Sequence, residues 1–194
     1  MKLPQNKHFT SSHLSSSPKD LEDIKAFEIV PETGRGLELY LKQSALPDEC
    51  LGLMRTYLVR LKRTGELVGY FSLKAGLISI NEERTSQTVT FDTLPGVELA
   101  NFAVNSAFLK KHSAKGLGYV LFSRLIAPFV KEHAKTLGIY MLYLFALPYE
   151  RLMKTYENYG FNRLPPKAEN QLHQRLKPAY DESCIFMYQP LSEM

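Results

Sequence analysis

The chain has 194 residues, a length that suits one domain of ordinary size with a hydrophobic core of its own. Hydrophobic residues make up 44% and charged residues 23%, which is typical of a globular protein. The net charge of +4 permits an anionic ligand, but the basic residues are scattered and argue against a dedicated nucleic-acid-binding tail.

The cysteines and histidines give no sign of a metal site. Cys50 and Cys184 lie far apart without a CxxC spacing, which indicates two reduced thiols. The histidines form neither an HxxxH nor an HExxH pattern, so we predict that no metal is bound. The N-terminus lacks the apolar core of a secretory signal, and no apolar run approaches the length of a membrane span. We therefore predict a cytoplasmic protein without a membrane partner.

The beginning of the chain is predicted to be a flexible arm followed by helices. Residues 1–16 are polar and rich in serine, so we expect a flexible N-terminal arm there and a single domain over residues 17–194. Ser17 as a cap and Pro18 at the first helical position predict the start of a helix. A second amphipathic helix is indicated over residues 37–45.

The pattern changes to that of strands after residue 55. Two segments rich in β-branched and aromatic residues, 56–62 and 67–80, predict a β-hairpin. Residues 81–96 begin polar and end in Pro-Gly, which predicts a turn. The next segment, "VELANFAV" (97–104), is apolar on both faces, as is typical of a short central strand that is buried on both sides.

The remaining elements alternate between helix and strand. They are a helix from Leu117 that Pro128 should kink or divide, a buried strand over 139–147, a helix over 148–160 closed by Gly160, a loop over 164–180 and a last strand over 183–189. This order of elements predicts a mixed α/β or α+β sheet with helices packed on it.

A glycine-rich loop stands between the central strand and the next helix, in "KHSAKGLGYVLF" (111–122). The loop is not a dinucleotide-binding fingerprint, because Leu121 stands where the third glycine is required, and it lacks the lysine of a Walker loop. Glycines at a helix N-terminus suit an anion, and Lys110, Lys111 and Lys115 add positive charge. These residues favour a pyrophosphate site and a flexible turn about equally.

Two longer stretches carry a resemblance to a known family. "LANFAVNSAFLKKHSAKGLGYVLFSRLI", followed about 30 residues later by "LFAL…KTYENYGF", resembles the GNAT superfamily of acyl-CoA-dependent N-acetyltransferases. The resemblance covers roughly residues 56–163. It implies a central, mostly antiparallel and twisted α+β sheet of about six to seven strands, splayed in the middle and flanked by about four helices. It also implies transfer of an acetyl group from acetyl-CoA to a primary amine by direct attack.

The resemblance assigns acetyl-CoA to the glycine-rich loop and to the end of the central strand. In the family the loop grips the pyrophosphate, with an Arg or Gln where this chain has Ser113; Lys115 could compensate in part. Main-chain N–H groups at the splayed strand end would hold the oxyanion. The cofactor-binding residues implied in this way are Phe102, Ala103, Val104, Ser113, Ala114, Lys115, Gly116, Leu117 and Gly118.

Two side chains are the candidates for catalysis. The resemblance implies that Tyr156 protonates the leaving thiolate; otherwise it is an aromatic residue of a helix packed on the core. Glu98 is the only charged residue in "GVELANFAV", and some members of the superfamily have their glutamate base at the equivalent place. Glu98 is therefore either the general base or a carboxylate neutralised by a nearby cation, and a water chain could replace it as base.

The acceptor stays open at this stage. A small-molecule amine, a protein amine and an aminoacyl-tRNA all fit, and "LELYLKQSAL", "LVGYFSL" and "TLGI…ALP" resemble the toxin-type acetyltransferases that modify aminoacyl-tRNA. A non-catalytic module that binds acyl-CoA is the alternative from another class. The sequence is also compatible with a homodimer.

Overall fold

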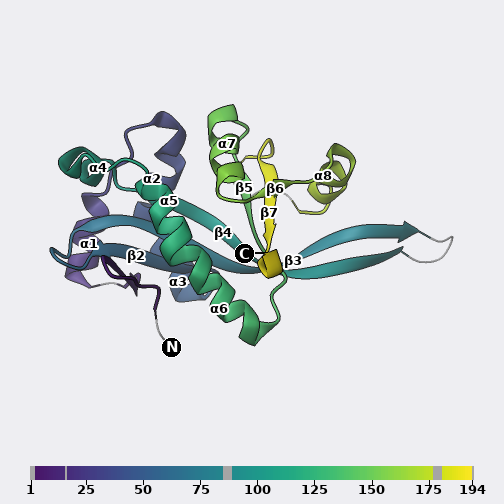
Figure 1. Ribbon diagram of the computed structural model, residues 1–194, viewed down its shortest axis with the longest axis horizontal. Helices are drawn as coiled ribbons and strands as arrows, with labels where there is room; N and C mark the ends of the chain where they lie inside the picture. The colour runs from purple at the N-terminus through teal and green to yellow at the C-terminus, as the bar shows by residue number, and fades with distance from the viewer. Residues whose placement is uncertain (1–2, 16, 85–88, 177–180, 194) are drawn as a thin grey trace. The chain divides into compact units, whose positions relative to one another are not determined.

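The computed structural model describes residues 3–15, 17–84, 89–176 and 181–193 (Figure 1). Hydrogen bonds link seven strands in the order β1-β2-β3-β4-β5-β7-β6. The β4–β5 pair is parallel, whereas β1–β2, β2–β3, β5–β7 and β6–β7 are antiparallel. The predicted fold class, a mostly antiparallel α+β sheet flanked by helices, is confirmed.

The strands are β1 (Phe9–His13), β2 (Arg55–Leu61), β3 (Leu67–Arg84), β4 (Val89–Val104), β5 (Met141–Ala146), β6 (Asn162–Arg163) and β7 (Ile185–Pro190). The α-helices are α1 (Pro18–Lys25), α2 (Arg35–Gln43), α3 (Ala45–Leu51), α4 (Ser106–His112), α5 (Leu117–Leu121), α6 (Ala127–Leu137), α7 (Glu150–Asn158) and α8 (Pro166–His173). Contacts group the chain into two units: unit 1 is Met1–Lys74 with Leu99–Phe129, and unit 2 is Ala75–Glu98 with Val130–Met194.

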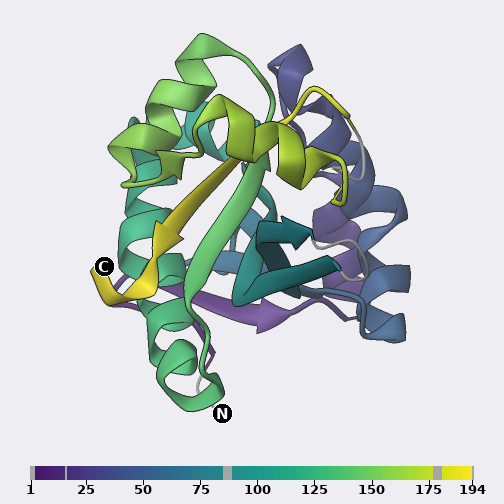
Figure 2. The same ribbon diagram turned by 90° about the vertical axis from the view of Figure 1, so that its right-hand side faces the viewer.

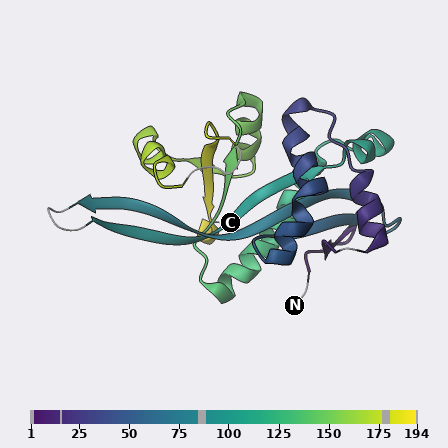
Figure 3. The same ribbon diagram turned by 180° about the vertical axis from the view of Figure 1, so that it is seen from behind.

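Unit 1 has helices on both faces of its strands. Figures 1 and 3 show α1, α2 and α3 over one face and α5 over the other. Side chains alternate accordingly, since neighbouring residues of a strand point to opposite faces. Leu58 and Tyr70 are fully buried in the cluster formed with α1 to α3. On the other face Tyr57 stacks on Phe71 with ring centroids 4.7 Å apart.

The first helix begins where its cap predicts. The Ser17 side chain accepts a hydrogen bond from the Asp20 N–H at 3.2 Å, and Pro18 occupies the first turn. The buried Arg60 of β2 then holds α1 against the sheet through ion pairs with Asp20, at 2.6 Å, and with Asp23.

Unit 2 is built around β5, whose six residues are all buried. It pairs with β7 along its whole length and with β4 over three residues, Gly96 to Glu98. Figure 2 shows β5 and β7 side by side, with α7 and α8 packed over them. Phe145, Phe186 and Leu172 of α8 share one hydrophobic cluster, so α8 covers the two strands through its apolar side.

Several expectations from the sequence need correction. Residues 9–13, inside the expected arm, form β1 and pair with β2, because Phe9 and the following Leu14 can both be buried. The division at residue 17 itself stays a prediction. The expected Pro-Gly turn at 95–96 is instead part of β4: Gly96 has no positive φ, and the Pro95 carbonyl accepts a hydrogen bond from the Tyr140 N–H at 2.8 Å.

The sequence also underestimated the helices, since α3, α4 and α8 were not expected. The segment 164–180, predicted to be a loop, contains α8, which has Pro166 at its start and Glu169 in its first turn. Residues 177–180 of that segment lie outside the described residues, as do 85–88 of the polar segment. A turn of π-helix over Phe122–Ile126 separates α5 from α6, just before Pro128, where a break or kink was expected.

Two predicted absences can be compared with the described part of the chain. None of its helices is long and apolar enough to cross a membrane. No three His, Cys, Asp or Glu side chains within it gather as metal ligands do. Cys50 is exposed and Cys184 is buried, and both are free thiols.

Candidate active site

The glycine-rich loop joins α4 to α5 through two residues in the left-handed conformation. Ser113 has φ 48° and ends α4, and Gly116 has φ 68° and precedes α5. Ser113 is the only non-glycine residue with positive φ among those described. The N–H groups of Ser113 and Ala114 both donate to the Leu109 carbonyl and close the end of α4, so the donors left for an anion are those at the start of α5. At the position where the family has Arg or Gln, Ser113 contributes the turn between the two helices.

The loop is open toward solvent. A side chain at Gly116 would meet nothing within 4 Å, and Ser113 and Lys115 are exposed. The first N–H groups of a helix have no partner within the helix and carry partial positive charge. The start of α5 thus fits a pyrophosphate group.

Part of the positive charge expected at the loop is neutralised by Glu66, which lies in the turn between β2 and β3. Its carboxylate forms an ion pair with Lys111 and a 3.2 Å contact with the His112 imidazole. The hydrogen bond from Lys111 lowers the pKa of Glu66 to about 2. Glu66 therefore braces the last turn of α4. Lys115 forms no ion pair with any described residue, so its charge is available to a ligand.

The end of β4 approaches β3 closely. A side chain at Gly69 would place its Cβ 2.5 Å from the carbonyl oxygen of Ala103 and 3.3 Å from the Cα of Val104. Glycine at this position is what allows the backbone of β4 to lie where it does. Phe102 and Val104 are half-buried, whereas Ala103 is buried.

The residue that joins this strand end to α4 was missed by sequence reasoning. Asn105 accepts a hydrogen bond from the Ala107 N–H at 3.1 Å and donates through its side-chain amide to the Leu67 carbonyl at 3.2 Å. Its own N–H donates to the Val68 carbonyl at 2.9 Å. Asparagine is a preferred N-cap, so this residue type before "SAFLKKH" was the signal that could have found both Asn105 and α4.

Glu98 lies in unit 2, beside Tyr143. The two residues face each other in the β4–β5 register, and the Tyr143 hydroxyl lies 3.5 Å from Glu98 Oε2. Burial raises the pKa of Tyr143, and the charge of Glu98 raises it further, so the phenol stays protonated and points a donor at the carboxylate.

Two glycines make the space for Tyr143. A side chain at Gly76 of β3 would overlap the Tyr143 hydroxyl, and the Cβ of any residue at Gly96 would lie 2.9 Å from its ring. Tyr143 is 2% exposed. Glycines in adjacent strands thus fit this tyrosine to the glutamate, a relation that the sequence alone did not reveal.

Tyr156 lies in α7, also in unit 2. Its ring meets Tyr159 and Phe161 edge-on, with centroids 6.0 and 5.9 Å apart. Burial raises the pKa of the Tyr156 phenol, and Tyr159 raises it further. The side chain therefore keeps its proton across the neutral and mildly alkaline range.

The predicted site residues thus fall into two groups. Residues 102–104 and the loop 113–118 belong to unit 1, joined by α4, while Glu98 and Tyr156 belong to unit 2. Their roles stay predictions.

Solved structures with the same fold include toxins. A tyrosine-to-phenylalanine mutant of the toxin AtaT has a TM-score of 0.67 and 16% identity, with 99% of this chain and 94% of that chain covered. AtaT complexed with acetyl-methionyl-tRNAfMet has a TM-score of 0.66 and 16% identity, covering 95% and 96%. AtaTR bound with AcCoA has a TM-score of 0.62 and 18% identity, covering 97% and 96%. No protein-family model matches the chain. The fold is the GNAT-like one that the resemblance implied.

Proposed function

We propose that this chain is an N-acetyltransferase that transfers an acetyl group from acetyl-CoA to the amino group of an aminoacyl-tRNA. The observation that carries the proposal is the shared fold over 95% or more of the chain with AtaT bound to acetyl-methionyl-tRNAfMet and with AtaTR bound to AcCoA. The resemblance of "LELYLKQSAL" and "LVGYFSL" to toxin-type acetyltransferases points the same way. Acetyl-CoA and aminoacyl-tRNA are both present in the cytoplasm, which is where we expect the protein.

The residues of unit 1 are assigned to binding. The loop 113–118 would hold the pyrophosphate of acetyl-CoA, because it is open and α5 begins with unpaired N–H groups. The N–H groups of Ser113 and Ala114 donate to the Leu109 carbonyl, so the donors to the ligand would come from the later residues of the loop. Lys115 would add one positive charge. The main-chain N–H groups of residues 102–104 would hold the thioester oxygen as it gains negative charge.

The residues of unit 2 are assigned to proton transfer. Attack by the amine forms a C–N bond and breaks the C–S bond of the thioester. Tyr156 would give a proton to the sulfur as it leaves, and Glu98 would take the proton that the amine loses. Tyr143 would orient Glu98 by donating to its carboxylate.

The test of the function is transfer of radiolabelled acetyl from acetyl-CoA to tRNAs charged individually with each amino acid. We expect label on the α-amino group of one or a few aminoacyl-tRNAs, and none on the same tRNAs after deacylation. Label on small amines alone would retain the acetyltransferase and remove the tRNA acceptor. Binding of acetyl-CoA without transfer to any amine would favour a non-catalytic acyl-CoA-binding module.

Glu98→Gln tests the base. A general base works when deprotonated, so the wild-type rate should fall as the pH drops below the pKa of Glu98. We expect the glutamine variant to lose roughly 10²-fold in kcat/KM at neutral pH and to lose this acid-side fall. The measurement is kcat/KM against pH.

Tyr143→Phe is the variant to compare with wild type in the same measurement of kcat/KM against pH. It keeps the buried ring and removes the donor that stabilises the ionised carboxylate, so the acid-side fall should move to higher pH. An unchanged rate and profile in Glu98→Gln would mean that water, and not Glu98, removes the proton.

A further inference from the structure

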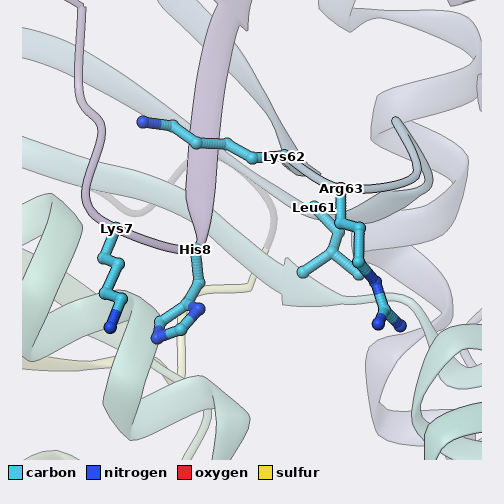
Figure 4. Close-up of a pocket in the computed structure, with 5 residues that line it drawn as sticks. All are labelled: Lys7, His8, Leu61, Lys62 and Arg63. Carbon is cyan, nitrogen blue, oxygen red and sulfur yellow. The ribbon is translucent and has the colours of Figure 1, made fainter.

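A hollow with a basic lining lies at one end of the β1–β2 pair. Its volume is about 460 Å³, and it is lined by Lys7, His8, Leu61, Lys62 and Arg63 (Figure 4). Figure 4 shows Lys7 and His8 side by side at the start of β1, with Lys62 and Arg63 on the turn that follows β2. Four of the five lining residues are basic, and none is acidic.

The backbone beneath this hollow is held firmly, so the cationic side chains start from fixed points. The Lys62 N–H donates to the His8 carbonyl at 2.8 Å, which joins the two segments. The turn itself is closed by the Gly65 N–H donating to the Leu61 carbonyl at 2.8 Å. Gly65 has φ 74°, the left-handed conformation that this turn requires. Pre-ordered anchors reduce the entropy lost when a ligand binds.

Within the described residues, the cations at the hollow form no ion pair. Some other cations there do bind carboxylates, as in Arg60 with Asp20, Arg55 with Glu49 and Lys111 with Glu66. Across the same residues Lys7, Lys62 and Arg63 have no carboxylate within 4.0 Å; Lys62 donates only to the Gln5 amide oxygen at 3.1 Å. Glu66 is the acidic residue nearest to Arg63 in the sequence, but its carboxylate contacts Lys111 and His112 of α4.

The chemistry of the hollow fits phosphate groups. Lysine and arginine are the side chains that most often bind the phosphates of nucleic acids. The lining contains no Tyr, Phe or Trp on which a base would stack, so it suits the backbone and not a particular base sequence. An open hollow at the surface also suits a polymer that extends beyond it.

Resting on the proposed function, we infer that this hollow, formed by Lys7, His8, Lys62 and Arg63, binds the phosphate backbone of the RNA acceptor. The same turn carries Glu66, which braces the last turn of α4 before the glycine-rich loop. The turn between β2 and β3 therefore serves both ligands: one side contacts the RNA backbone, and Glu66 supports the loop assigned to acetyl-CoA. The acetyl-CoA 3′-phosphate offers the same chemistry and is distinguished by the test.

The test compares Lys62→Ala/Arg63→Ala with wild type in binding a fluorescein-labelled, deacylated tRNA, measured by fluorescence anisotropy over a range of KCl concentrations. Two lost phosphate contacts should weaken binding on the order of tenfold and reduce the slope of log K against log[KCl] by about 1.4 to 1.8. The control Lys25→Ala/Lys135→Ala removes two exposed lysines at the ends of α1 and α6 and should leave both quantities unchanged.

A titration of acetyl-CoA into each variant distinguishes the two sources of phosphate and the two proposals. We expect its affinity to stay at the wild-type value in Lys62→Ala/Arg63→Ala. Weaker acetyl-CoA binding with unchanged tRNA binding would overturn the inference, as would equal effects of the control variant or equally strong binding of a DNA duplex. If Lys62→Ala/Arg63→Ala loses tRNA binding as expected but wild type acetylates no charged tRNA, the inference about the hollow is supported and the proposed reaction is wrong.

Discussion

Replacing Tyr156 by phenylalanine is expected to lower the acetyl-transfer rate by about 10²-fold or more and to leave the affinity for acetyl-CoA unchanged. Phenylalanine keeps the ring that packs against Tyr159 and Phe161, so the helix should keep its place. What it removes is the proton donor, whose pKa burial raises. The loss should therefore appear in kcat, because the proton is needed only as the C–S bond breaks.

The matched control is Tyr159→Phe, which lies three residues after Tyr156, at the C-terminal cap of α7. It removes a hydroxyl from the neighbouring tyrosine, and the rate should stay close to wild type. The measurements are steady-state release of the free CoA thiol and calorimetric titration with acetyl-CoA. A Tyr156→Phe protein with wild-type kcat would remove this residue from the mechanism, and one with weakened acetyl-CoA binding alone would make it a binding residue.

Replacing Asp20 by asparagine is expected to lower the free energy of unfolding by roughly 2–4 kcal/mol at pH 7, since it breaks one arm of the buried cluster with Arg60 and Asp23. Burial alone would raise the pKa of Asp20, but hydrogen bonds from Ser15 and Arg60 outweigh it and lower the pKa below 3.8. A carboxyl whose pKa is depressed by folding stabilises the protein above the unfolded-state pKa. That contribution is lost as the pH falls through the folded-state value.

The difference between wild type and Asp20→Asn should therefore be large at neutral pH and shrink at pH values below 3.8. The difference in the free energy of unfolding is measured by urea unfolding of both proteins at pH 7 and at a pH below 3.8. Glu22→Gln, an exposed position on the same helix, serves as control and should change stability by less than about 0.5 kcal/mol. A difference that is the same at both pH values would show that Asp20 contributes through packing and not through its charge.

Much of the architecture was predictable because its signals are local. The cap at Ser17, the hairpin after residue 55 and the buried strand at residues 139–147 each depend on a few adjacent residues. The β1 strand was missed because its apolar positions are sparse and its pairing with β2 joins segments about 50 residues apart. Strand pairing at that separation depends on register, which a short window of sequence does not contain.

The candidate site divides in the same way. The glycine-rich loop could be found in "KHSAKGLGYVLF", since its glycines and the helix after it are neighbours in the chain. That Ser113 adopts a left-handed conformation was not predictable from its residue type, because serine seldom does so. The contact between Glu98 and Tyr143 was not visible either, because two glycines on different strands make the room for it.

By itself the sequence indicated a mixed sheet flanked by helices, because helix caps and hydrophobic periodicity act over a few residues. The assignment of the glycine-rich loop to acetyl-CoA came from the resemblance to the GNAT superfamily and stays a prediction. Only the tertiary structure decided which charged side chains form ion pairs within the described residues and which do not. Glu66 neutralises Lys111, from a turn 45 residues earlier, while Lys62 and Arg63 of that same turn have no ion pair among the described residues. The reason is physical: charge pairing depends on distances of a few ångströms, and those are set by how strands and helices pack.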